Sequence, residues 1–138
     1  MEVFCLEEFK REFYKLKKNN SYNDIEAIIA EFFFGKDVKQ FIGLGSKLSG
    51  SSDFPFIKMR LKGRGGYRLY YLLFIKDNQL YLMFIHPKTG SLGAENISIS
   101  FQREIYASLL EAIKTNNLYK VEANDRKLSF THLAGNSE

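Results

Sequence analysis

The 138-residue chain contains little cysteine, histidine or proline and no tryptophan. Its one cysteine, Cys5, excludes an internal disulfide and any zinc site built from several cysteines. The only histidines, His86 and His132, leave few ligands for a metal, so we expect no metal and no other cofactor. The fold must therefore depend on apolar packing, which a chain of this length can supply without cross-links.

Long hydrophobic runs are missing as well. No stretch approaches the ~18 apolar residues of a membrane helix. The N-terminus has acidic residues and no long apolar region, so no signal peptide is predicted. We therefore expect a cytoplasmic protein without a membrane partner, and a single cysteine agrees with a reducing compartment.

Positive charge is concentrated in the middle of the chain. The net charge is +4, but residues 57–90 carry +6 and the remainder carries −2. The cations of this segment are Lys58, Arg60, Lys62, Arg64, Arg68, Lys76 and Lys88. A local excess of this kind attracts polyanions such as nucleic acid. The alternative is an ordinary solvated basic surface.

The spacing of apolar residues predicts two helices near the N-terminus. Leu6, Phe9, Phe13 and Leu16 recur at intervals of three and four, as on one face of a helix. Residues 25–33 repeat this pattern after a short polar turn. Two amphipathic helices joined by a short turn form an antiparallel pair.

Strands are expected on both sides of the helix pair, whereas residues 36–53, rich in glycine and serine, are expected to form a loop. The predicted strands cover residues 2–6, 56–61, 67–75 and 79–86, with further strands at 118–121 and 128–132 after a helix ending near 116. This order predicts an α+β fold, in which an N-terminal strand and helix pair pack on a small antiparallel sheet, followed by a C-terminal helix. We expect one domain over residues 1–117 and a C-terminal extension, residues 118–138, of unknown role.

Alternation places Lys58 and Arg60 on the same face of the strand at 56–61. A tight turn would bring Arg68 beside them, so that three cations converge within about 10 Å. Like charges in this position repel, and a polyanionic ligand would remove that repulsion. Arginine binds phosphate oxygens as a two-pronged donor, and lysine can act as a base when cationic neighbours lower its pKa. The cluster therefore indicates phosphodiester chemistry.

Four tyrosines near the cluster, Tyr67, Tyr70, Tyr71 and Tyr81, offer rings on which a nucleobase could stack. The alternative for each is packing in the core.

The chain resembles the RelE/ParE superfamily of toxins. The points of likeness are the Lys-x-Arg strand, the Gly-Gly-Tyr-Arg turn at 65–68 and the Pro-Lys-Thr-Gly at 87–90. The resemblance extends over roughly residues 1–115, and the segment from Lys58 to Arg68 is its specific part. It implies a ribosome-dependent endoribonuclease that cleaves mRNA, inhibits translation, needs no metal and is neutralised by a cognate antitoxin. The superfamily also contains gyrase poisons and degenerate members that only bind partners, so a non-enzymatic protein is the alternative. A basic module that only binds RNA is a third possibility.

The resemblance also implies roles for single residues. Lys58 would be the general base and a phosphate ligand, Arg60 a phosphate ligand, and Arg68 the group that stabilises the transition state. Lys88 would be an acid or a phosphate ligand. The family's C-terminal acid has no counterpart, and His86 is the candidate substitute, with Glu95 a weaker one. RNA contacts of lower specificity are expected from Lys62, Arg64 and Tyr67.

Overall fold

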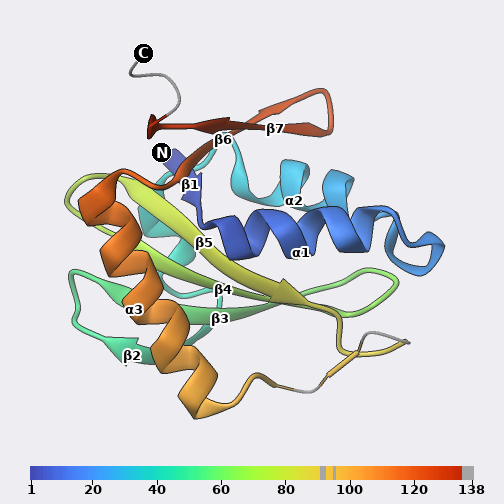
Figure 1. Ribbon diagram of the computed structural model, residues 1–138, viewed down its shortest axis with the longest axis horizontal. Coiled ribbons are helices and arrows are strands. Elements are labelled where there is room, and N and C mark those ends of the chain that lie inside the picture. Colours follow the sequence, from blue (N-terminus) through green and yellow to red (C-terminus); the bar gives the residue numbers. More distant parts are fainter. Residues whose placement is uncertain (91–92, 95, 135–138) are drawn as a thin grey trace.

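A computed structural model describes residues 1–90, 93–94 and 96–134. In this part of the chain, helices pack against one sheet of seven strands (Figure 1), which confirms the α+β fold. The helices are α1 (Glu7–Lys17), η1 (Asn20–Tyr22), α2 (Ile25–Phe33), η2 (Val38–Phe41) and α3 (Ile99–Thr115), where η marks a 3-10 helix. The strands are β1 (Glu2–Cys5), β2 (Ser46–Gly50), β3 (Pro55–Leu61), β4 (Tyr67–Phe74), β5 (Gln79–His86), β6 (Tyr119–Asn124) and β7 (Lys127–His132).

The strands lie in the order β2-β3-β4-β5-β1-β6-β7. Strands β3, β4 and β5 form the predicted antiparallel meander, and β1 lies parallel to β5. The parallel pairing requires a crossover, and the chain between β1 and β5 provides it with α1, α2, the two 3-10 helices and strands β2 to β4.

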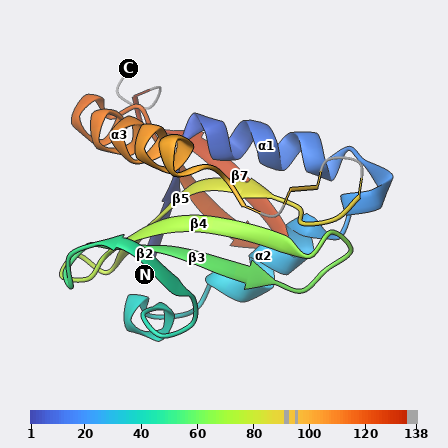
Figure 2. The ribbon, with the colours of Figure 1, turned by 90° about the horizontal axis from the view of Figure 1, so that it is seen from below.

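Two apolar layers separate the sheet from its helices. On one face, α1 and α2 bury the residues whose spacing predicted them: Phe9, Phe13, Leu16, Ile25, Ile29 and Phe33. On the other face, α3 covers the sheet with Ile105, Leu109 and Ala112. Figure 2 shows α3 on one side of strands β3 to β5. Arg60, Arg68 and His86 lie near one end of β3, β4 and β5, on the same face of the sheet as α3.

Strand β2 lies where the sequence predicted only a loop. Its side chains are exposed or half-buried on both faces, so it lacks the apolar alternation that reveals a strand. Backbone pairing with β3 forms it, with a register shift between Lys47 and Ser49. Gly45, just before β2, packs so closely on β3 that a Cβ atom there would lie 2.6 Å from the carbonyl oxygen of Lys58.

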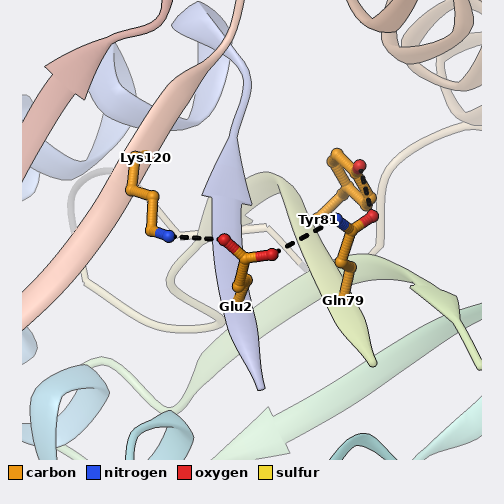
Figure 3. Close-up of polar contacts among 4 residues, drawn as sticks. All are labelled: Glu2, Gln79, Tyr81 and Lys120. Carbon is orange, nitrogen blue, oxygen red and sulfur yellow. Dashed lines mark hydrogen bonds and ion pairs between the residues drawn. The ribbon is translucent and has the colours of Figure 1, made fainter. Parts of the chain in front are cut away.

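The C-terminal extension belongs to the same sheet. Strand β6 pairs with β1 and β7 pairs with β6, so residues 118–134 are not a separately packed unit; residues 135–138 lie outside the described part. Side chains reinforce this joint (Figure 3). Lys120 Nζ lies 2.6 Å from Glu2 Oε2, Gln79 Nε2 donates to Glu2 Oε1, and the Tyr81 hydroxyl donates to Gln79. The network therefore links β6, β1 and β5.

Candidate functional site

The strand register brings the predicted cations together. Arg60 on β3 lies directly opposite Arg68 on β4, and Lys58 lies opposite Tyr70. Arg68 in turn lies opposite His86 on β5. Side chains at paired positions point to the same face and have Cβ atoms about 5 Å apart. Lys58, Arg60, Arg68 and His86 therefore share one face, as alternation predicted for the first three.

Arg68 is buried rather than exposed, contrary to expectation. Only 6% of its surface is accessible. Its Nη1 donates weakly to the Gly66 carbonyl at 3.3 Å, and its Nε has no hydrogen-bond partner. No acid of the described residues forms an ion pair with Arg68. A buried cation without a counter-charge is costly, and an anionic ligand would relieve that cost.

His86 is buried beside Arg68 and both of its ring nitrogens are engaged. Nδ1 lies 2.9 Å from the Pro87 carbonyl oxygen, which can only accept, so Nδ1 holds the proton. Nε2 then accepts a hydrogen bond from the Tyr70 hydroxyl at 3.0 Å. Burial lowers the pKa of His86, and the charges of Arg68 and Lys58 lower it further. The ring is therefore held neutral, and it can deliver a proton only after one of these bonds breaks.

Lys58 is half-buried at the centre of the face. Its Nζ donates to the amide oxygen of Asn96 at 2.6 Å, across the segment that leads into α3. Burial lowers the pKa of Lys58, and the neighbouring charges of Arg60 and Arg68 lower it further. A lowered pKa makes lysine a better base near neutral pH. Asparagine supplies only a neutral acceptor, which a phosphate oxygen could replace with a full charge.

Arg60 is the exposed member of the cluster. With Lys58 it lines a cavity of about 320 Å³ whose other walls are Leu44, Gly45 and Ser46, at the start of β2. Among the described residues Arg60 forms no ion pair. Its guanidinium is thus available to a ligand that enters this cavity.

The remaining predicted cations surround the cluster. Lys62, Arg64 and Lys88 are all exposed. The guanidinium of Arg64 already makes one hydrogen bond within the protein, because its Nη1 donates to the Asn20 carbonyl at 3.0 Å. Lys88 reaches the neighbourhood of Arg68 through its backbone: its N–H donates to Gly66 O at 3.2 Å, the carbonyl that Arg68 also contacts.

The prediction that Tyr67 contacts RNA is wrong. Tyr67 is fully buried on the opposite face, within the core beneath α1 and α2, and its hydroxyl donates to Asp24. The same Asp24 accepts from the Arg64 backbone N–H, so Tyr67 anchors the turn between β3 and β4 to the start of α2. Tyr70, Tyr71 and Tyr81 are buried too, which leaves none of the four rings able to stack on a base. The prediction relied on Tyr67 being next to Arg68 in the sequence. Adjacent residues of a strand point to opposite faces of the sheet, so Tyr67 could not share the face of Arg68.

Sequence reasoning also missed Asn96 and the pairing of Tyr70 with His86. Nothing in the sequence indicates a role for Asn96. Its side chain meets Lys58 only because the folded chain brings this loop next to β3. The Tyr70–His86 pair follows from the register of β4 and β5, which contains an irregularity between Tyr70 and Tyr71 that alternation cannot anticipate. Glu95, the weaker acid candidate, lies outside the described residues.

A metal site is not found within the described ranges, where no three His, Cys, Asp or Glu side chains lie close enough to share an ion. In the same part of the chain, no helix has the length and apolar character needed to cross a membrane.

A scan of the chain against protein-family models gives no match, and a search among curated proteins gives none. Chemically, the cluster offers Lys58 as a base candidate and the guanidinium groups of Arg60 and Arg68, with a small cavity beside Lys58 and Arg60. This combination can bind a phosphodiester and stabilise additional negative charge on it.

Proposed function

We propose that this chain is a metal-independent endoribonuclease toxin of the RelE type, which cleaves mRNA on the ribosome in the cytoplasm and is neutralised by an antitoxin. The observation that supports this most is Arg68, a buried arginine with no acidic partner among the described residues, placed opposite Arg60 and next to Lys58. Three cations at one point of a sheet have no structural benefit, but they suit a phosphate group.

The proposed reaction uses the RNA's own 2′-hydroxyl as the nucleophile. Lys58, whose pKa is lowered by burial and by Arg60 and Arg68, removes the 2′ proton. Arg60 and Arg68 hold the non-bridging oxygens and stabilise the charge that builds up as the 2′ oxygen attacks phosphorus and the 5′ oxygen leaves. Phosphate oxygens displace Asn96 from Lys58 in this process.

The proton for the departing 5′ oxygen is best assigned to Lys88. It is exposed and lies next to Gly66, whose carbonyl Arg68 contacts. His86 is less suited, because both of its nitrogens are already bonded within the protein.

A second candidate is a non-enzymatic binder of the same fold, such as a gyrase poison. The burial of Arg68 and the Asn96 bond to Lys58 favour it, since both restrict access of RNA to the cluster. In that case the cluster would serve only to bind an anionic or acidic partner.

The deciding experiment is cell-free translation with purified protein, with transcript ends mapped by primer extension. Lys58→Ala and Arg68→Ala are compared with Lys76→Ala, which removes an exposed cation of the same basic segment at the far end of β4. The wild type and Lys76→Ala should inhibit translation and create new ends within translated codons. The other two variants should lose about 100-fold or more in cutting.

Naked RNA should be cut far less than RNA on ribosomes. Undisturbed translation with no new ends would refute the nuclease proposal and leave the binder, which an assay of DNA supercoiling by gyrase would then test.

A further inference from the structure

The segment that leads into α3 contacts the cationic cluster and is anchored beside it. Asn96 accepts a hydrogen bond from Lys58 Nζ at 2.6 Å, and the half-buried Ile97 packs on the apolar layer between α3 and the sheet. Ser98 caps α3, because its hydroxyl accepts from the Phe101 backbone N–H at 3.0 Å. Asn96 is therefore held where it occupies a donor of Lys58 that an anion would need.

A chain of three hydrogen bonds connects this segment to the end of β5. The Tyr70 hydroxyl donates to His86 Nε2 at 3.0 Å, and His86 Nδ1 donates to the Pro87 carbonyl oxygen at 2.9 Å. Burial raises the pKa of Tyr70, and a hydrogen bond with the Ile97 backbone lowers it. A bond that lowers this pKa stabilises the ionised oxygen, so the Ile97 N–H is its donor. Tyr70 thus accepts from the segment and donates to His86.

Both side chains in the middle of this chain are buried. Tyr70 is fully enclosed and His86 nearly so, and their rings stack with centroids 5.6 Å apart. A buried polar group that loses its partner has no solvent to replace it, which costs free energy. A change of bonding at His86 is therefore passed on to Tyr70 and from there to Ile97.

A proton on His86 reverses the direction of this chain. Protonated histidine donates from both ring nitrogens, so Nε2 no longer accepts the Tyr70 hydrogen. The hydroxyl hydrogen of a phenol lies in the plane of the ring, on one side of the oxygen or the other. Once Tyr70 accepts from His86, its hydrogen must take the side on which the Ile97 N–H approaches. Two donors then face each other, and the bond between Tyr70 and the segment is lost.

The groups around His86 make its protonation sensitive to a bound anion. Burial lowers the pKa of His86, the bond to the Pro87 carbonyl opposes this, and the charges of Arg68 on β4 and Lys58 on β3 lower it further. The remaining ring contacts are aromatic: Tyr70 on β4, and Phe84 on β5 with Phe101 of α3 behind it. An anion bound to Arg68 and Lys58 would offset both charges and favour the protonated ring.

From these contacts we infer that Tyr70 and His86 form a proton-linked latch that closes the cationic cluster. With His86 neutral, Tyr70 holds the segment at Ile97, and Asn96 occupies Lys58. With His86 protonated, the segment is released, Lys58 is free to bind an anion, and the Tyr70 hydroxyl can donate to an oxygen of that anion. Uptake of the proton and binding of the anion therefore favour each other. Both residues are positioning residues, and the inference rests on the anion-binding part of the proposed function, not on cleavage.

The test measures binding of a short single-stranded DNA oligonucleotide to the full chain between about pH 7.5 and 5.5, the ordinary histidine range. DNA lacks the 2′-hydroxyl that the proposed cleavage needs, and the charge of a phosphodiester is constant over this range. The affinity, followed by fluorescence anisotropy at constant ionic strength, should rise as the pH falls, by up to about tenfold per pH unit. His86→Gln should remove this slope, because glutamine can accept the Tyr70 hydrogen but takes up no proton. His132→Gln should retain it.

Hydrogen exchange follows the segment itself. The Ile97 amide should lose protection as the pH falls, after correction for the intrinsic exchange rate. The Leu6 amide, which donates to the Leu82 carbonyl at 3.1 Å, should keep its protection. Tyr70→Phe should leave the Ile97 amide unprotected at every pH. Tyr81→Phe, which removes a hydroxyl bonded to Gln79 instead, is the matched control and should behave as the wild type does.

Replacing Asn96 tests whether the closed latch blocks the cluster. Asn96→Ala should strengthen oligonucleotide binding about tenfold at neutral pH, because Lys58 then has no bond to give up before it binds the anion. Asn124→Ala, at an exposed position at the end of β6, should bind as the wild type does. Thermal melting at each pH checks that the variants are folded, and if Tyr70→Phe does not fold, His86→Gln and Asn96→Ala still decide the question.

Several results would overturn the latch: an affinity independent of pH, an equal slope in His86→Gln, or unchanged protection of the Ile97 amide. Weaker binding by Asn96→Ala would do so too, since Asn96 would then assist the ligand. No binding at any pH would refute the anion site and the latch together. RNA cut on ribosomes with a DNA affinity independent of pH would refute the latch alone, whereas the expected slope without any cutting would refute the nuclease alone.

Discussion

Arg60 and Arg68 lie directly opposite each other on adjacent antiparallel strands. Two like charges in this position destabilise a sheet, and the burial of Arg68 adds the cost of removing its charge from water. A fold that retains such a pair gives up stability at this point, as is common where a site must bind a charged ligand.

Replacing Arg68 with methionine should stabilise the protein while removing its proposed activity. Methionine fills a similar volume without a charge, so the free energy of unfolding in urea should rise by about 1 kcal/mol or more. Arg11→Met, on an exposed position of α1, should change it by less than about 0.5 kcal/mol. A clear loss of stability in Arg68→Met would mean that the guanidinium contributes to the fold.

The pKa of Lys58 should depend on its cationic neighbour. Burial lowers it from 10.5, and Arg60 and then Arg68 lower it further. Arg60→Gln should therefore raise the pKa of Lys58, as followed by NMR of the labelled lysine Cε and Nζ nuclei during a pH titration. Lys62→Gln, which removes an exposed charge beyond the end of β3, is the control and should leave it nearly unchanged. If cleavage occurs, the rising limb of its pH profile should move to higher pH in Arg60→Gln.

His86 should make the protein less stable as the pH falls. The unfolded chain takes up a proton near pH 6.5, while the folded chain does so only at lower pH, because burial, Arg68 and Lys58 lower the pKa of His86. The stabilisation is therefore complete above pH 6.5 and is lost as pH falls through the folded pKa. Urea melts between about pH 7.5 and 5.5 should show this slope, which spans the ordinary histidine range. His86→Gln should flatten it, and His132→Gln should retain it.

Glu26 should stabilise the packing of the β6–β7 hairpin against the helix pair. This carboxylate, buried in α2, accepts the Leu128 backbone N–H at 2.9 Å and lies 3.2 Å from Lys17 Nζ. Glu26→Ala leaves a buried N–H without its partner and should lower the free energy of unfolding by about 2 kcal/mol. Hydrogen exchange should then quicken at Leu128. Glu31→Ala breaks the exposed pair with Arg126 and should cost less than about 1 kcal/mol. Equal costs in the two variants would contradict this role.

Periodicity accounts for most of what was predicted correctly. The helices α1 and α2 each bury one stripe, and β3 alternates around Lys58 and Arg60, so burial imposes a repeat that is visible in the sequence. Strands β4 and β5 are buried on both faces and are visible instead as apolar runs between turns. The repeat in β3 placed Lys58 and Arg60 together. The paired turn placed Arg68 beside them, so the core of the candidate site was predictable.

Features without a buried stripe were not predictable. Strand β2 exposes both faces and forms through backbone pairing with β3, so no alternation of apolar side chains predicts it. The error on Tyr67 has a different cause, since a tyrosine beside an arginine was assigned to the ligand although adjacent strand residues point to opposite faces.

The sequence by itself determined the α+β class, the helix pair, the meander and the shared face of Lys58, Arg60 and Arg68, because each depends on the spacing of neighbouring residues. Only the tertiary structure decided that Arg68 and His86 are buried, that Asn96 contacts Lys58, and that β6 and β7 complete the sheet beside β1. These features bring together residues that are distant in the sequence. Their burial and pairing depend on the path of the backbone, which the spacing of neighbouring residues does not reveal.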